Sequence, residues 1–201
     1  MTTITQEAPA RSREAEPLGD DTARTRLLRA AADLFCRYGI NATGVDAVVT
    51  AAGTAKTTLY KTFGSKEGLV EAVLEAEGAA WRDWFLAEIE KRADDPVGKL
   101  IGVFDVLEAW FAQDHFFGCP FINVVGEFDK EDERYKRIAL AHKSIIMKRL
   151  TELAAESGAE APEALAHQIG LLIDGSIVAA MISGDASIAR FARSATAKLL
   201  A

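Results

Sequence analysis

Apolar residues recur at helical spacing through most of this chain of 201 residues. Leu27, Ala31, Leu34, Phe35 and Tyr38 follow one another at intervals of three and four, which is the period of one face of an α-helix. No alternating β-branched run bounded by turn residues predicts a strand. The pattern therefore predicts an all-α fold of about nine helices. They cover about 22–38, 43–52, 55–62, 66–92, 97–113, 131–157, 162–183 and 186–200, with a loop and a short or broken helix within 116–128.

Glycines and short polar side chains mark the ends of these helices. Gly39 and Gly53 are expected to stop the first two, because glycine tolerates the left-handed backbone found after helix ends. Thr43 is predicted to cap the second helix, with Asp46 as the acid of a capping box. Ser65 is a good N-cap for the long helix that follows. Three short, closely spaced helices are thus expected before a long one.

The composition is that of a soluble globular protein, with 49% hydrophobic and 26% charged residues. This excludes collagen-like, disordered and disulfide-scaffold chains. We divide the chain into a mobile tail at 1–20, a small domain at 21–66 and a larger helical domain at 67–201. Cys36 and Cys119 show no metal-binding spacing, and no apolar run approaches the ~20 residues of a membrane span. A cytoplasmic protein without a secretion signal is expected.

Charge is unevenly distributed along the chain. The formal net charge is −7, which by itself argues against a nucleic-acid partner. Residues 22–66, however, carry seven basic and two acidic side chains, a local net charge of +5, whereas residues 67–201 sum to −9. A helix, a tight turn at Gly53 and a short basic helix suit a helix-turn-helix, whose second helix enters the major groove. On spacing alone, a plain three-helix subdomain with surface lysines fits equally well.

The residues of this segment resemble a known family. They are similar to the DNA-binding domain of TetR-type transcriptional regulators over about 45 consecutive residues. The matching segments are Ala31-Ala32-Asp33-Leu34-Phe35, Tyr38-Gly39, Thr43-Gly44-Val45, Ala51-Ala52-Gly53-Thr54-Ala55-Lys56-Thr57-Thr58-Leu59-Tyr60-Lys61-Thr62-Phe63 and Ser65-Lys66-Glu67-Gly68-Leu69. In the larger domain only Gly118-Cys119-Pro120-Phe121-Ile122-Asn123 resembles a segment of one subgroup.

The resemblance implies a DNA-binding transcriptional regulator and assigns roles to individual residues. Thr43 would contact phosphate at a helix N-terminus, and Lys66 would clamp phosphate. Lys56, Thr57 and Thr58 would face the groove, and Tyr60 and Lys61 would contact the DNA backbone or base edges. Ala55 stands where a capping serine is common, so Thr54 is expected to take over that cap. Arg24 and Arg26 could touch phosphate or nothing, and Tyr60 could instead belong to the core.

The larger domain is expected to bind a small hydrophobic effector, as regulators resembling this one do. Pockets need apolar walls and a few polar groups that orient the ligand. The candidate lining residues are Trp81, Trp84, Phe85, Phe104, Trp110, Phe111, His115, Cys119, Phe121, Asn123, Glu127, His142 and Asp174. Most of the aromatic residues must also be core, and each polar candidate could be an ordinary buried or surface group. The acidic balance favours a neutral or cationic aromatic effector.

The last two long helices are predicted to form a homodimer interface. The helix at 162–183 is apolar over most of its circumference, so it cannot face water on any broad side. The predicted contact residues are Leu165, Ile169, Leu172, Ile173, Ile177, Met181, Phe191, Ala195 and Leu199. In two copies this patch resembles the four-helix dimer interface of TetR-type regulators, and a twofold axis implies a near-palindromic DNA operator. The alternative is that the helix is the buried centre of a monomer.

No catalytic motif accompanies these features. The chain contains no nucleophile elbow, phosphate-binding glycine loop, dinucleotide fingerprint or zinc-protease helix. His115, His142 and His167 do not form a metal-binding spacing, so no metal and no cofactor are expected. A redox role for Cys119 needs a nearby cation or helix start, and the neighbouring sequence shows neither. The rival to a regulator is a helical ligand-binding protein that has lost DNA binding. The sequence leaves open the effector, the operator and whether DNA binding represses or activates.

Overall fold

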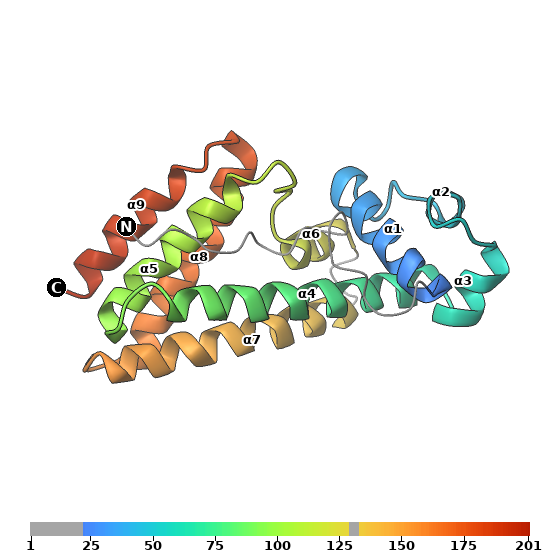
Figure 1. The fold of residues 1–201 in the computed structure, drawn as a ribbon. Helices are drawn as coiled ribbons and strands as arrows, with labels where there is room; N and C mark the ends of the chain where they lie inside the picture. The colour runs from blue at the N-terminus through green and yellow to red at the C-terminus, as the bar shows by residue number, and fades with distance from the viewer. Residues whose placement is uncertain (1–21, 129–132) are drawn as a thin grey trace. The chain divides into compact units, whose positions relative to one another are not determined.

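The computed structural model describes residues 22–128 and 133–201, and within these residues it contains nine helices and no strand (Figure 1). The predicted all-α fold is therefore confirmed. The predicted tail at 1–20 lies outside the described residues. The helices are α1 (Ala23–Tyr38), α2 (Val45–Ala51), α3 (Lys56–Phe63), α4 (Lys66–Glu90), α5 (Pro96–Phe111), α6 (Pro120–Glu127), α7 (Glu133–Glu156), α8 (Pro162–Ser183) and α9 (Ile188–Leu199).

Most predicted helix boundaries rest on local capping chemistry that the structure reproduces. Gly39 follows α1 with φ of 85° and donates its N–H to the Phe35 carbonyl. The Ser65 hydroxyl accepts the Gly68 N–H at 3.1 Å at the start of α4. The Asp95 carboxylate accepts the Gly98 N–H at 2.8 Å and caps α5. These interactions link residues a few positions apart, so the sequence alone could specify them.

The predicted cap of α2 is wrong. The N-cap residue is Gly44, which has no side chain to offer. The Thr43 hydroxyl points back toward α1 and donates to the Gly39 carbonyl at 2.7 Å, and Thr43 is only 4% exposed. Asp46 does not close a capping box either, because its carboxylate binds Lys56. Thr43 thus joins α2 to the end of α1, and its buried hydroxyl lacks the exposure that the expected phosphate contact requires.

The chain divides into two compact units. The first contains α1 to α3, residues of α4 up to Trp81, α6 and the start of α7. Its α1 packs against α2 and α3, with Leu27, Val48 and Leu59 buried between them. Tyr38, predicted to continue the buried stripe of α1, is instead 62% exposed, because it lies in the last turn of the helix.

The second unit holds the end of α4, α5, most of α7, and α8 with α9. Here α5 packs against both α8 and α9, which also contact each other. Helix α8 spans 22 residues with a mean hydropathy of 1.6, so by length and composition alone it could cross a membrane. That is weak evidence for a span, since the core helix of a bundle has the same properties, and α8 buries Ile169 and Ile173 in this unit.

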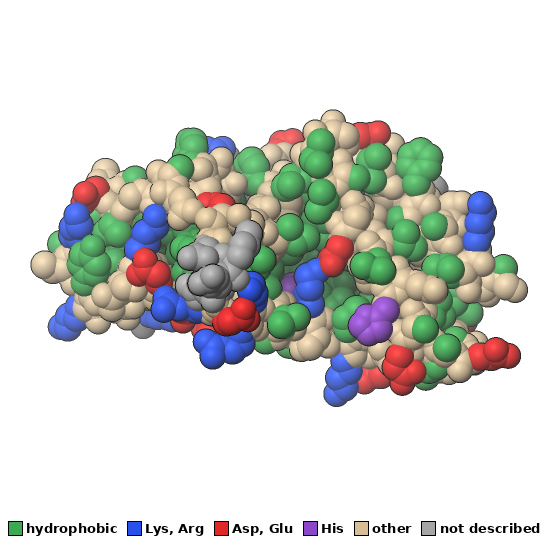
Figure 2. All heavy atoms as spheres, turned by 180° about the vertical axis from the view of Figure 1, so that it is seen from behind, with side chains coloured by type: hydrophobic (Ala, Val, Ile, Leu, Met, Phe, Trp, Pro, Cys, Tyr) green, Lys and Arg blue, Asp and Glu red, His purple; other side chains and the backbone are tan. Residues whose placement is uncertain are grey.

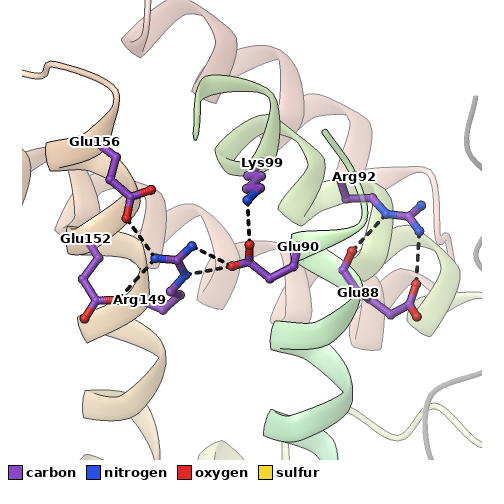
Figure 3. Close-up of polar contacts among 7 residues, drawn as sticks. All are labelled: Glu88, Glu90, Arg92, Lys99, Arg149, Glu152 and Glu156. Atoms are coloured by element: carbon purple, nitrogen blue, oxygen red, sulfur yellow. Dashed lines mark hydrogen bonds and ion pairs between the residues drawn. The ribbon is translucent and has the colours of Figure 1, made fainter. Parts of the chain in front are cut away.

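Two groups of ion pairs lie at the end of α4 in the second unit, and one of them joins different helices (Figure 3). On the surface, the Glu90 carboxylate binds Lys99 and Arg149, each at 2.7 Å, and Arg149 also reaches Glu152 and Glu156. These contacts lower the pKa of Glu90, with the hydrogen bond from Lys99 as the main cause. Glu90 lies on α4 and Arg149 on α7, so the network ties these two helices together.

The other group is buried. Glu88 is inaccessible to solvent, and its carboxylate accepts from Lys91 at 2.7 Å and from Arg92 at 3.1 Å. The stem of Arg92 passes directly over Gly102 of α5, where an added Cβ would lie 2.5 Å from Arg92 Cβ. Glycine at this position therefore allows the end of α4 to approach α5 closely.

Candidate nucleic-acid interface

Helix α3 has one buried side and one open side. Leu59 is fully buried against α1 and α2 and anchors the helix. Tyr60 is 45% exposed, and Thr57 and Lys61 are also exposed. The alternative that Tyr60 belongs to the core is thus excluded. Thr58 is half-buried, and its carbonyl accepts the Thr62 hydroxyl at 2.8 Å.

The start of α3 is held by an ion pair. Lys56 Nζ lies 2.9 Å from Oδ1 and 3.1 Å from Oδ2 of Asp46 on α2. The hydrogen bond to Asp46 raises the pKa of Lys56, so the amine is charged. The expected cap by Thr54 is wrong, because the N-cap of α3 is Ala55 and the buried Thr54 Oγ1 has no partner among the described residues. The pair with Asp46 links the start of α3 to α2.

Three further basic residues flank the helix-turn-helix. The Arg26 guanidinium donates to the carbonyl of Ala52 at 3.1 Å, so it provides a hydrogen-bond donor for a backbone carbonyl at the end of α2. Arg24 lies over the ring of Phe63, 5.7 Å from its centre, in a cation–π contact. Lys66 is the first residue of α4 and is half-buried. Arg24 and Arg26 therefore both have structural partners, which the sequence did not reveal.

Comparison with known proteins places this arrangement in a family. The family model of bacterial regulatory proteins of the tetR family matches residues 27–73, which cover α1 to α3 and the first part of α4. A solved structure, a putative TetR transcriptional regulator from Streptomyces avermitilis, is 30% identical, with a TM-score of 0.73. The match covers 87% of this chain and 98% of that one. The chain belongs to the TetR family.

Two other similarities agree with this TetR-family assignment. A TetR-family transcriptional regulator from Streptomyces coelicolor has a TM-score of 0.81 at 26% identity, over 89% of this chain and 94% of that chain. The transcriptional repressor KstR2 of Mycolicibacterium smegmatis is 36% identical over 84 residues, which are 40% of this chain and 39% of that protein. This TetR-family chain is thus a transcriptional regulator with a helix-turn-helix DNA-binding domain.

The predicted dimer residues of this TetR-family chain fall into three groups, which are buried, half-buried and exposed. Leu165, Ile169, Ile173 and Ile177 are at most 7% exposed and pack inside their own unit. For them the prediction of a dimer contact is wrong, because they are the core side of α8. Leu172 and Ala195 are half-buried. The exposed large apolar residues of α8 and α9 are Leu171, Met181, Ile182, Phe191 and Leu199.

Three of these residues are exposed over most of their surface. Leu171 and Ile182 are 73% and 77% exposed on α8, and Phe191 is 74% exposed on α9. The view from behind shows hydrophobic side chains gathered at the surface of this part of the chain (Figure 2). Leu171 and Ile182 were missed by the sequence prediction, because α8 is apolar on nearly all sides and periodicity cannot identify its outer face.

The aromatic residues predicted to line an effector pocket are mainly core. Trp84, Phe85, Phe104, Trp110, Phe111 and Phe121 are all at most 8% exposed, and so is Cys119. Trp81 and His115 are half-buried. Trp110 and Phe111 pack with Phe116, with ring centres 5.0 and 4.9 Å from that of Phe116. Asp174, another predicted pocket residue, forms an ion pair with Lys143 at the surface of α8.

His142, also predicted to face a ligand, is buried against a cation. Its Nδ1 lies 2.8 Å from Nη1 of Arg82. A guanidinium can only donate, so Nδ1 accepts and the imidazole is neutral, with its proton on Nε2. Burial, together with the charges of Arg82 and Lys143, lowers the pKa of His142 to about 3.

The depressed pKa of His142 predicts a loss of stability in acid. The unfolded chain binds a proton near pH 6.5 and the folded chain does not until about pH 3, so stability falls as pH drops through this window. Between about pH 7.5 and about pH 5 the loss should be about 2 kcal/mol. His142→Asn keeps an acceptor for Arg82 and should remove this part of the pH dependence. Urea unfolding of both proteins at the two pH values measures the free energy of unfolding. An equal change in this free energy between the two pH values for the wild type and His142→Asn would contradict a neutral, buried His142.

A pocket lies inside the first unit, between α1, α4 and α6. The pocket is small, with a volume of about 30 Å³ open to a molecule the size of water. Of the predicted effector-binding residues, Asn123 and Glu127 line it. The other lining residues are Phe35, Cys36, Ile40, Val70, Val73, Leu74, Glu77 and Pro120. The residues from α1 and α4 were missed, because their spacing is that of ordinary core positions and only the fold brings α6 beside them.

Proposed function

We propose that this regulator binds a near-palindromic operator as a homodimer, with α3 in the major groove, and represses transcription until a small effector releases it. The observation that carries the proposal is the two-sided α3: Leu59 anchors the helix while Thr57, Tyr60 and Lys61 face outward. A recognition helix needs this combination of a rigid base and open polar side chains. The match to a relative named as a repressor supports the direction of regulation.

The homodimer is supported by the exposed apolar residues of α8 and α9. Leu171, Ile182 and Phe191 are each more than 70% exposed, and a cluster of such residues marks an interaction surface. In a twofold dimer the same surface contributes from both copies, and the two α3 helices become equivalent. Half-sites about one helical turn apart, ~34–36 Å, are then expected. Like other regulators of this kind, the protein is proposed to work in the cytoplasm.

The primary test is operator binding. A gel-shift experiment at low salt, with the promoter region next to the gene of this protein and with a selected random DNA pool, should yield a specific complex. The bound sequence should be a near-palindrome, and mass measurement of the complex should give two protein chains. Failure to bind either DNA would favour a helical ligand-binding protein without DNA binding.

Substitutions on α3 should separate base reading from phosphate contact. Tyr60→Ala and Lys61→Ala should each weaken operator binding by about 1–3 kcal/mol, because each removes a groove contact without touching the core. Lys66→Ala should instead weaken all DNA sequences alike and reduce the salt dependence. Tyr38→Ala, a second exposed tyrosine outside α3, is the matched control. Dissociation constants unchanged by both α3 variants at fixed salt would remove α3 from the interface.

A further inference from the structure

We propose that Asp46 directs the amine of Lys56 toward a guanine base edge of the operator and away from DNA phosphate. Asp46 is thus a positioning residue for sequence recognition. This inference rests on the proposed DNA-binding function and adds to it the residue that makes one contact depend on base sequence. It uses only residues of α2 and α3, which lie in the first unit.

Lys56 and Asp46 form an ion pair between the two helices of the helix-turn-helix. Lys56 is the first residue of α3, and Asp46 is the second residue of α2. The amine lies within hydrogen-bond distance of both carboxylate oxygens, 2.9 Å from Oδ1 and 3.1 Å from Oδ2. The side chain of Lys56 is 50% exposed and that of Asp46 is 80% exposed, so DNA can approach the pair from solvent.

The pair leaves part of the amine available to a further acceptor. An ammonium group has three N–H donors, and one carboxylate accepts at most two of them. While Asp46 holds the amine, the remaining donor has few directions open to it, whereas an unpaired lysine carries its charge on a flexible stem. The first residues of a recognition helix are the ones that contact base edges in the major groove. The remaining donor of Lys56 is therefore at the end of α3 where base acceptors are expected.

The charge of Asp46 distinguishes between two kinds of DNA acceptor. Phosphate is anionic, so a carboxylate bound to the same amine repels it. Guanine O6 and N7 are neutral acceptors that a lysine can contact in the major groove. Because phosphate contacts carry no sequence information, a residue that disfavours them lowers the affinity for every DNA sequence but raises the preference for the correct one.

Without Asp46, the start of α3 would attract phosphate. Its N-cap is Ala55, which has no side-chain cap, and its first turn contains no acidic residue. The free amides of a helix N-terminus favour an anion, and Lys56 adds a full positive charge to them. The carboxylate bound at this end of α3 comes instead from α2. The pair therefore sets the charge at the end of the helix that is proposed to enter the groove.

DNA binding by single variants tests the role of Asp46. Affinities for the selected operator and for random DNA of equal length are measured over a range of salt concentrations. In Asp46→Asn the freed Lys56 should bind random DNA about fivefold more tightly, and the salt slope should steepen by about 0.9, as for one more phosphate contact. Its preference for one G·C pair in each half-site should fall on the order of tenfold. Tighter binding to random DNA cannot result from a loss of folding.

A double variant and a matched control make the test specific. Lys56→Met should lose the same base preference without a steeper salt slope. Adding Asp46→Asn to Lys56→Met should not change that preference further, because Asp46 acts through Lys56. The control is Asp33→Asn, which removes a 43% exposed aspartate paired with Arg37 at 3.7 Å on α1, and it should keep the wild-type preference. A base preference in Asp46→Asn equal to that of the wild type overturns the inference.

The ion pair can also be measured without DNA. The hydrogen bond to Asp46 raises the pKa of Lys56. The pKa of this amine, followed by NMR, should therefore be lower in Asp46→Asn than in the wild type and unchanged in Asp33→Asn. An equal pKa in Asp46→Asn and the wild type would show that Asp46 does not hold the amine, and the inference would fail.

The outcomes separate this inference from the proposed function. If an operator is bound and Asp46→Asn loses the base preference, both stand. If an operator is bound and the preference does not change, the regulator stands and the role of Asp46 fails. If neither the operator nor random DNA is bound at low salt, the proposed function fails, and the role of Asp46 in recognition fails with it.

Discussion

Replacing Glu88 with Gln is expected to lower the stability of the folded chain by about 3–5 kcal/mol. Glu88 is fully buried and Arg92 is only 5% exposed at its side chain, so the variant leaves a buried guanidinium without its carboxylate. Water cannot reach the charge to compensate, which is why losing one partner of a buried pair costs more than the pair contributes. In a chain of this size the melting temperature should fall on the order of 10 °C.

Two further variants make this expectation specific. Glu152→Gln removes a carboxylate that is 46% exposed and also binds an arginine, and it should cost less than about 1 kcal/mol. The double variant Glu88→Gln with Arg92→Met should recover part of the loss, because it also removes the buried positive charge and keeps an unbranched stem over Gly102. Thermal unfolding at one protein concentration compares the four proteins. A loss in Glu88→Gln no greater than in Glu152→Gln would show that the buried pair is not important for stability.

The double variant Ile182→Glu with Phe191→Glu is expected to convert the proposed dimer into a monomer and to weaken operator binding strongly. Both side chains are more than 70% exposed in the single chain, so their replacement should leave its core intact. In a dimer each would be buried twice, once per copy, and burying an unpaired carboxylate is strongly unfavourable. Loss of the dimer separates the two recognition helices, so operator affinity should fall to that of one half-site.

Sedimentation at micromolar concentration gives the readout for this variant. The wild type should sediment at twice the mass of the 21.7 kDa chain and the variant near 21.7 kDa. Leu140→Glu places the same charge at another exposed leucine, on α7, and should leave the dimer unchanged. A monomeric wild type would refute the homodimer and the palindrome together, and a dimeric double variant would place the interface elsewhere.

Local features of this protein were determined by its sequence. The helix ends at Gly39 and Ser65 depend on residues three or four positions apart, so spacing and residue type were sufficient to predict them. The family resemblance over the helix-turn-helix was visible for the same reason, because that motif is one continuous segment. Leu59 was correctly expected to be buried, since Leu59 and Phe63 are four residues apart and therefore lie on one face of α3.

Only the tertiary structure decided which residues are buried and which hydrogen-bond partners they have, because several arrangements were chemically equivalent. Helix α8 is apolar nearly all round, so its sequence could not tell the core residue Ile173 from the exposed Ile182. Thr43 could have capped α2, yet packing directs its hydroxyl to the Gly39 carbonyl. Glu127 meets Asn41 across 86 positions of sequence. Contacts of this kind depend on how helices dock, and docking is set by the combined burial of many side chains, which no local spacing records.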